Sequence, residues 1–264
     1  MKQIKYIFLL SIIFFACDEI NPVNDISNDY NFLCVIKNDQ AIQKAYLYKS
    51  INIEETLISN ATFIHDAEII VSNGTIFSQL QVREFQVHYS TLLEYTYSDD
   101  SFFQGKILPN TRYDVQIKIN NEIVTGSTTT PGEFTINRPS NDTLYLYQGV
   151  YDYYYIPVSW NKSTNSFQYL VYSIITYKSN DGKEMEDSWF GNTADTSTTV
   201  SFQRMSISQE GIQYHAYQVK FIVYAIDKNY YDHAFLSRDR AGLSAQYGVF
   251  GSTIVDSCIV DIIR

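Results

Sequence analysis

The sequence predicts an all-β protein made of two consecutive β-sandwich domains that follow an N-terminal export segment. Three observations lead to this fold class. Apolar and polar residues alternate over short stretches, which is typical of strands with one buried face. Turn-forming pairs such as Asn-Gly separate these stretches, which is typical of hairpins. The chain has 264 residues and so exceeds one typical domain of about 100 to 150 residues, which indicates two cores.

Residues 1–16 predict a signal peptide. A basic start precedes an apolar run over residues 6–16, which is too short to span a bilayer as a helix, since that takes ~20 residues. The run ends in Phe14-Phe15-Ala16-Cys17, which resembles the lipobox cut by the lipoprotein signal peptidase. An ordinary signal peptide cut elsewhere is the alternative, but Phe14 suits it poorly because that cut needs small residues. We therefore expect Cys17 to carry acyl chains that anchor the mature protein in a membrane.

Residues 17–29 predict a flexible tether, because after the cysteine they are polar and without period. The first domain is expected over residues 30–131. Asn73-Gly74 and Asn120-Asn121 predict hairpin turns in it, because Gly and Asn tolerate a positive φ. Residues 113–119 alternate in polarity, which predicts a strand. Its buried face would hold Tyr113, Val115, Ile117 and Ile119.

The boundary between the domains is expected at Thr128–Gly132. There a proline, which cannot donate to a sheet, and a glycine, which frees the backbone, follow a finished hairpin. The second domain is expected over residues 132–264. Its runs 167–175 and 217–225 are apolar or aromatic at most positions, which predicts central strands of a sandwich.

Three shorter segments of the second domain predict turns. Asn180-Asp181-Gly182 is expected to join two strands. Residues 205–213 and 230–238 could each form a short turn of helix, and no long amphipathic helix is expected.

The charge argues against some partners. The formal net charge is -10, and removal of the signal peptide takes away Lys2 and Lys5 and brings it to -12. Phosphate backbones bind clustered Lys and Arg, so we expect no nucleic-acid partner. Solubility at a crowded surface explains the charge better than an acidic binding face.

Two cysteines, Cys34 and Cys258, remain once Cys17 is lipidated. An exported chain permits a disulfide, but these two lie in apolar runs at opposite ends of the chain, in different predicted domains. We expect buried free thiols, with pairing as the alternative. No Cys-x-x-Cys or Cys/His cluster predicts a metal site.

No local catalytic motif is present, so we assign no catalytic, metal or cofactor residue and expect no enzyme. The chain lacks Gly-x-Ser-x-Gly, His-Glu-x-x-His, phosphate-loop and EF-hand patterns, and Ser244 is interpreted as a loop serine. The densest acidic pairs, Asp99-Asp100 and Glu184–Asp187, are interpreted as solvated loop acids, with weak calcium binding second. A hydrolase acting through them is an alternative that depends on their separation in space. The four histidines stand singly: His65, His88, His215 and His233.

Tyrosine is the feature that points to binding, since it accounts for 23 of the 264 residues. The ring is a flat apolar face with a polar tip, which suits sugar stacking or a protein interface. The alternative is packing within the sheet, where alternation would bury half of the rings, and we favour it. The candidate recognition face comprises Tyr145, Tyr147, Tyr151, Tyr153, Tyr154 and Tyr155.

The order of these features resembles the two-domain lipoproteins of unknown function common in Bacteroidota. In the first domain the resemblance rests on residues 66–71, 108–115 and 128–131, which are similar to small transthyretin-like or carboxypeptidase-regulatory-like sandwiches. Residues 247–252 look like the closing strand region of that family. The resemblance implies a fold and a location and brings no activity with it.

The second domain resembles a fibronectin type III module. Val158-Ser159-Trp160 followed by Tyr172-Ser173-Ile174 has the spacing of its core tryptophan and the next strand, and Val219–Asp227 is similar to its penultimate strand. Val219 stands where the module usually has a tyrosine, so the tyrosine corner departs from the pattern. Residues 228–246 are an insertion relative to the simple module.

Asp18 and Glu19 directly follow Cys17 and resemble the acidic export tag of lipoproteins in that phylum. The alternative is that two acids keep a tether soluble. We expect a lipid-anchored outer-membrane protein that faces the cell surface, with the periplasmic face as the alternative.

The expected function is a non-catalytic binding or scaffold module at the cell envelope. An accessory glycan- or peptide-binding subunit of an outer-membrane nutrient uptake system is one alternative, whose partner would be a transport protein or a glycan. The hydrolase is the other.

Overall fold

The computed structural model describes residues 30–40, 43–49, 63–86, 93–99, 107–139, 145–147, 152–207, 212–244 and 247–262. This part of the chain holds strands β1 to β17 and one helix, α1, which confirms the all-β prediction. No helix in these ranges is long and apolar enough to cross a membrane. The predictions for Cys17, Asp18, Glu19 and Tyr151 lie outside the described residues.

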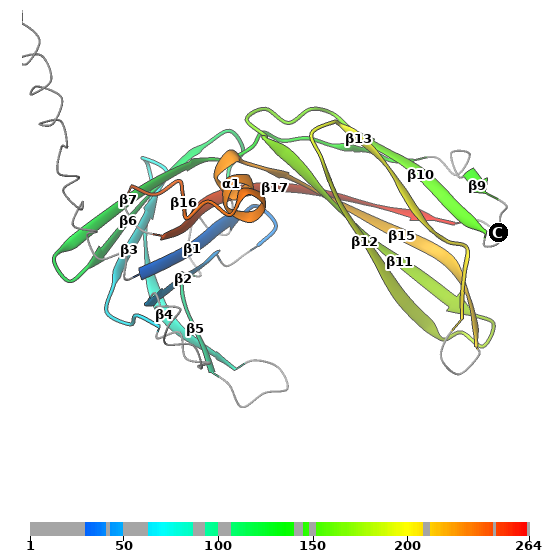
Figure 1. Ribbon diagram of the computed structural model, residues 1–264, viewed down its shortest axis with the longest axis horizontal. Coiled ribbons are helices and arrows are strands. Elements are labelled where there is room, and N and C mark those ends of the chain that lie inside the picture. The colour runs from blue at the N-terminus through cyan, green and yellow to red at the C-terminus, as the bar shows by residue number, and fades with distance from the viewer. Residues whose placement is uncertain are drawn as a thin grey trace, which may run out of the picture.

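Thirteen of the described strands form one continuous hydrogen-bonded sheet that runs through two lobes (Figure 1). In the first lobe β4 changes layer, since its first half pairs with β3 and its second half with β5. The sheet therefore folds over a core that includes Phe32, Tyr97 and Tyr113. Its strands, in order, are β1 (Tyr30–Lys37), β2 (Gln43–Lys49), β5 (Leu93–Asp99), β4 (Phe77–Gln86), β3 (Glu68–Ser72), β6 (Arg112–Ile119) and β7 (Glu122–Thr129).

The second lobe is a sandwich of two sheets. One layer continues the long sheet with β12 (Glu184–Thr193), β11 (Gln168–Ser179), β15 (Gln213–Ile226), β14 (Met205–Ile207) and part of β17 (Tyr247–Asp261). The other layer comprises β13 (Ser197–Gln203), β10 (Tyr153–Trp160), β8 (Ile136–Asn137) and β9 (Tyr145–Tyr147). The buried core between them includes Trp160, whose ring lies 5.2 Å from that of Tyr169.

The last strand, β17, belongs to both lobes (Figure 1). Residues 247–253 pair in parallel with β1, and residues 253–261 pair antiparallel with β15. Phe250 is fully buried in the core of the first lobe. Gly248 has φ +113°, and a Cβ there would lie 1.9 Å from the carbonyl oxygen of Phe32, so the close pairing with β1 depends on glycine. The expected second domain therefore supplies a strand to the first lobe. Whether residues 30–131 and 132–264 fold as separate units stays a prediction.

The residues at that division are packed rather than exposed. Thr130 is fully buried, and its hydroxyl donates to the carbonyl of Leu108 at 2.7 Å. The backbone N–H of Gly132 donates to the carbonyl of Thr164 at 2.7 Å, which ties the connection to a loop of the second lobe. The proline and glycine thus mark a buried crossing between lobes.

The predicted turns are confirmed, and the predicted helical turn is wrong for residues 205–207, while residues 208–211 lie outside the described residues. Asn73-Gly74, Asn120-Asn121 and residues 180–182 join β3 to β4, β6 to β7 and β11 to β12. The segment 230–238 overlaps α1 (Lys228–Leu236), whereas Met205–Ile207 is strand β14 because it pairs with β15. The runs 168–175 and 217–225 lie in β11 and β15, which are flanked by strands on both sides as predicted, and residue 167 directly precedes β11.

Candidate functional site

The outer face of the sheet in the first lobe carries two rows of side chains in register. Residues directly opposite each other on antiparallel strands project from the same face. One row crosses four strands and consists of Phe77, Ser72, Asp114 and Ser127. The next row consists of Gln79, Ile70, Gln116 and Thr125. The alternate residues of the same strands, such as Val71 and Val115, are buried in the core.

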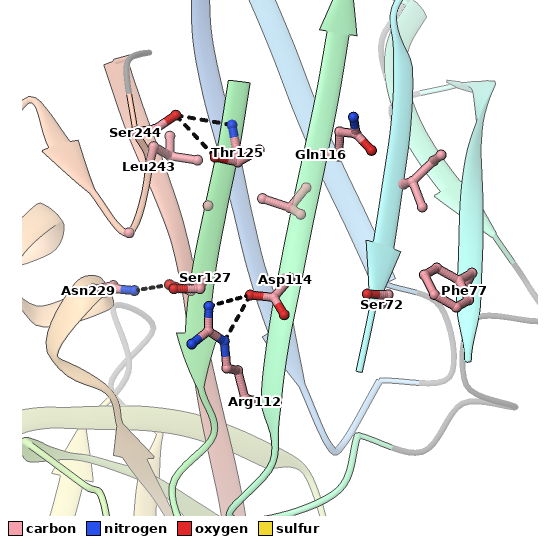
Figure 2. A pocket seen from close by; sticks show the side chains of 14 residues that line it. Ser72, Phe77, Arg112, Asp114, Gln116, Thr125, Ser127, Asn229, Leu243 and Ser244 are labelled. Carbon is pink, nitrogen blue, oxygen red and sulfur yellow. Dashed lines mark hydrogen bonds and ion pairs between the residues drawn. The ribbon is translucent and has the colours of Figure 1, made fainter. Parts of the chain in front are cut away.

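The segment after β15 crosses to this face and forms a wall beside it. We call it the strap (residues 227–244); it contains α1, β16 (Arg240–Ala241) and Gly242–Ser244. The strap hydrogen-bonds the edge of β7: Ser127 N donates to Gly242 O at 2.9 Å, and Ser244 N donates to Thr125 O at 2.8 Å. Thr125 N also donates to the Ser244 hydroxyl oxygen at 3.1 Å (Figure 2). The strap therefore covers an edge that would otherwise be open to another strand.

Two glycines allow the strap to approach β7 closely. A Cβ on Gly126 would lie 2.4 Å from Gly242 O and 2.8 Å from Leu243 Cδ2. Gly242 itself has φ +76°, a conformation that favours glycine, and a Cβ there would meet the Asn229 side chain at 2.3 Å.

Asp227 fixes the start of the strap where the lobes meet. It caps α1, because its carboxylate accepts a hydrogen bond from Tyr230 N at 2.9 Å. The same carboxylate accepts from the Thr128 hydroxyl at 2.5 Å and from Ser252 N at 3.1 Å, so it joins β7 and β17. Asn229 adds to this by donating to the carbonyls of Ser127 and Phe250 at 2.9 and 3.0 Å.

The rows and the strap enclose a groove of about 940 Å³ (Figure 2). Its floor is the outer face of β3, β6 and β7, and one wall is formed by Asn229, Leu243 and Ser244 of the strap. Phe77 lies at the far end, and its side chain is 72% exposed. Both lobes contribute to this groove: its floor belongs to the first lobe, and its wall is the strap, which continues the chain from β15 of the second lobe.

The charges in the groove neutralise each other. Arg112 and Asp114 are its two charged lining residues, and Arg112 Nη2 lies 2.8 Å from Asp114 Oδ1. Arg112 Nε also donates to that carboxylate, at 2.9 Å. A smaller hollow of about 380 Å³ adjoins the groove and shares Arg112, Ser127 and Asn229 with it. The arrangement offers hydrogen-bonding groups and one exposed ring without a net charge.

The structure separates the predicted tyrosine face into two sides. Tyr154 packs on the core of the second lobe, with its ring 5.7 Å from that of Phe202. Tyr153 and Tyr155 are half-buried on the opposite side of β10, where positions 147 and 145 of β9 lie directly across from them. The preference for sheet packing is confirmed for Tyr154, and the recognition role of Tyr145, Tyr147, Tyr153 and Tyr155 stays a prediction.

The loop interpretation of the acidic groups is wrong for Glu184–Asp187. Glu184, Glu186 and Asp187 are exposed on strand β12, because this segment pairs along its length with β11. Glu184 lies 3.5 Å from Lys178. Asp99 ends β5, and Asp100 is outside the described residues. In the described part of the chain no three His, Cys, Asp or Glu side chains gather into a metal-holding group.

The single histidines and the cysteines remain apart. His65 is exposed beside the ring of Phe63, while His88 is outside the described residues. Cys34 is buried and free, and burial raises the pKa of its thiol to about 12. Cys258 is free but only half-buried, so burial is confirmed for Cys34 alone. Cys34 pairs with Phe250 across β1 and β17. Phe250 precedes Cys258 by eight residues on the same strand, which places Cys34 roughly 26 Å from Cys258. This distance excludes a disulfide between the two cysteines.

The groove was not found from the sequence. Alternation in residues 112–118 predicts that Arg112, Asp114 and Gln116 face outward, which is the signal that could have indicated it. The alignment of these residues with Phe77, and the strap wall, depend on pairings between distant segments. Ser244, interpreted as a loop serine, is a lining residue.

No protein-family model and no curated protein matches the chain. Among solved structures, a DUF4785 family protein from Legionella pneumophila is 9% identical, with 83% of this chain and 55% of that chain covered and a TM-score of 0.21. A structure of the chaperone–tip adhesin complex of CFA/I fimbriae biogenesis is 8% identical, covers 75% and 84%, and has a TM-score of 0.17. The C-terminal globular domain of oligosaccharyltransferase from Pyrococcus abyssi is 9% identical, covers 89% and 48%, and has a TM-score of 0.16. This chain spans about half the length of the Legionella protein, and at these TM-scores none of the three assigns it a function.

Proposed function

We propose that the protein is a lipid-anchored binding module of a bacterial cell envelope, which holds a polar ligand in the groove beneath the strap. The observation that carries the binding role is the groove itself. Its two in-register rows present hydroxyl, amide and aromatic groups, and its wall comes from a segment that reaches it from the other lobe. A few convergent polar groups beside apolar surface are what ligand sites commonly offer.

The anchor is supported by the sequence of residues 1–17. Acyl chains on Cys17 would hold the protein at the membrane, and residues 17–29 would set it off from the surface. Asp18 and Glu19 support an outward location, on the resemblance to an export tag. A nutrient ligand held at this outward location would give the protein an accessory role in nutrient uptake.

Substitution of the lipid-bearing cysteine tests the anchor. Cys17→Ser is expected to leave an unprocessed precursor that takes up no labelled palmitate, because the thiol is the acylation site. Cys258→Ser serves as the matched control, because Cys258 is free and half-buried in the second lobe, and this variant should be processed normally. Normal processing and labelling of Cys17→Ser would disprove the anchor.

A ligand screen on the mature chain tests the binding role. A ligand present at 100 times its Kd stabilises the folded state by about 2.7 kcal/mol, which should raise Tm by several degrees. The screen should cover neutral oligosaccharides, anionic oligosaccharides and peptides. If no class raises Tm, the binding role is wrong.

A further inference from the structure

The charge of the groove restricts its ligand. The ion pair between Arg112 and Asp114 leaves no net charge among the lining residues, while the chain as a whole carries -10. An anionic ligand would be repelled by the surrounding chain, and a cationic one would find its carboxylate already paired with arginine. A neutral ligand meets neither cost.

The main chain of the groove's floor and of its strap wall is already hydrogen-bonded, which argues against a peptide added as a strand at these places. Extended peptides are commonly held by adding a strand to a free sheet edge. The backbones of β3 and β6 are paired on both sides, and the edge of β7 at Thr125 and Ser127 is taken by the strap. On this floor, recognition therefore comes from side chains, with Ser72, Gln116 and Thr125 as donors and acceptors.

The shape of the groove favours a chain of several units. It crosses from β4 through β3, β6 and β7 to the strap, which is four inter-strand spacings or roughly 19 Å. Phe77 stands at one end with its ring exposed, while hydroxyl and amide groups follow along the floor (Figure 2). An apolar ring face beside evenly spaced hydrogen-bonding groups matches a sugar, whose ring has an apolar face and whose rim carries hydroxyls.

We propose that the groove binds a neutral oligosaccharide, whose terminal ring packs on Phe77 and whose hydroxyls hydrogen-bond to Gln116, Thr125 and Ser72. The assignment rests on the binding role proposed above and narrows it to one class of ligand. The strap closes one side of the bound chain through Ser244 and Leu243.

Calorimetric titration of the mature chain tests this assignment. The probes are neutral hexasaccharides (cello-, malto-, xylo-, laminari- and mannohexaose), hexagalacturonate as the anionic counterpart, and a random hexapeptide pool. At least one neutral hexasaccharide is expected to bind, at least tenfold more tightly than hexagalacturonate or the peptides.

Variants locate the binding. Phe77→Ala should weaken the neutral hexasaccharide at least tenfold, and Gln116→Ala at least threefold. Phe190→Ala is the matched control, because that phenylalanine is 58% exposed on β12 in the other lobe, and Gln213→Ala is the control for the amide. Both controls should leave the affinity unchanged.

The outcomes separate the two proposals. If hexagalacturonate or the peptides bind better and depend on Phe77, the oligosaccharide assignment is wrong and the binding role stands. If a neutral hexasaccharide binds but Phe77→Ala and Gln116→Ala match the wild type, the groove is not its site and the assignment is wrong. If no probe of any class binds or raises Tm, both proposals are wrong.

Discussion

Asp227 is the residue on which the junction of the lobes depends. Its side chain is 4% exposed and accepts hydrogen bonds from β7, from β17 and from the first turn of α1. Removal of this buried carboxylate would leave its donors unsatisfied, and each buried donor without an acceptor lowers the stability of the fold by about 1 to 3 kcal/mol. One side chain thus ties the strap to both lobes.

Asp227→Ala is expected to lower the free energy of unfolding by about 2 kcal/mol or more. It removes a helix cap, worth about 1 kcal/mol, and leaves Ser252 N without its acceptor, while the Thr128 hydroxyl keeps only the Ser252 hydroxyl, at 2.9 Å. Urea denaturation measures the loss. The exposed Asp195→Ala is the control and should change stability by less than about 0.5 kcal/mol. A loss of that small size for Asp227→Ala would show that the cap and network contribute little.

The same residue predicts a pH dependence. Burial raises the pKa of the Asp227 carboxyl above its ordinary 3.8, against the opposing effect of the hydrogen bonds from Thr128, Tyr230 and Ser252. The folded state then holds the proton more tightly than the unfolded state, so this contribution is fully present below pH 3.8 and is lost as the pH rises through the raised pKa. The stability of the wild type relative to Asp227→Asn should therefore fall as the pH rises. A relative stability that rises with pH would show that the hydrogen bonds outweigh burial.

The strap is the element that turns a plain sheet face into a groove. Alternation predicted the strand at residues 113–119 and its outward residues, because a period of two depends only on neighbours in sequence. It could not predict the contact between Thr125 and Ser244, which are 119 residues apart. The sequence indicated an insertion at residues 228–246 with a short helical turn at 230–238, but not where this segment lies, since its placement depends on Asp227 and on Gly126 and Gly242.

Gly126→Ala is expected to release the strap from β7 without unfolding either lobe. The added methyl group would overlap Gly242 O and Leu243 Cδ2, and β7 cannot move because β6 holds its other side. Amide exchange at Ser127 and Ser244, whose N–H groups bond across this contact, should speed up at least tenfold.

Gly182→Ala is the control for this change. It strains a turn with φ +86° in the second lobe, has open space around it, and should leave those two amides protected. Unchanged exchange at Ser127 and Ser244 in Gly126→Ala would show that the strap accommodates the methyl group.

At the scale of the whole molecule, β17 and the strap join two cores into one sheet. The described residues form two hydrophobic clusters, one in each lobe. Phe250 belongs to the first cluster and Leu243 packs against it, although both lie far beyond residue 132. Local sequence patterns predicted two cores, because most strands that line a given core are close together in the sequence. The parallel pairing of β1 with β17 joins the two ends of the described chain, so no local pattern could indicate it.

This shared strand predicts that the two halves of the chain differ when they are separated. A fragment of residues 30–131 lacks Phe250, leaves β1 without its parallel partner, and loses the strap from β7; removal of a buried phenylalanine alone costs about 3 to 5 kcal/mol. A fragment of residues 132–264 keeps its own cluster, including Ile254 and Val260 of β17. We therefore expect the isolated fragment 132–264 to give the dispersed amide NMR resonances of a folded protein, and the isolated fragment 30–131 to give the poorly dispersed resonances of an unfolded one. Mixing the two fragments should restore the dispersed resonances of the first lobe. If 30–131 folds alone and ignores the other fragment, β17 contributes no essential part of its stability.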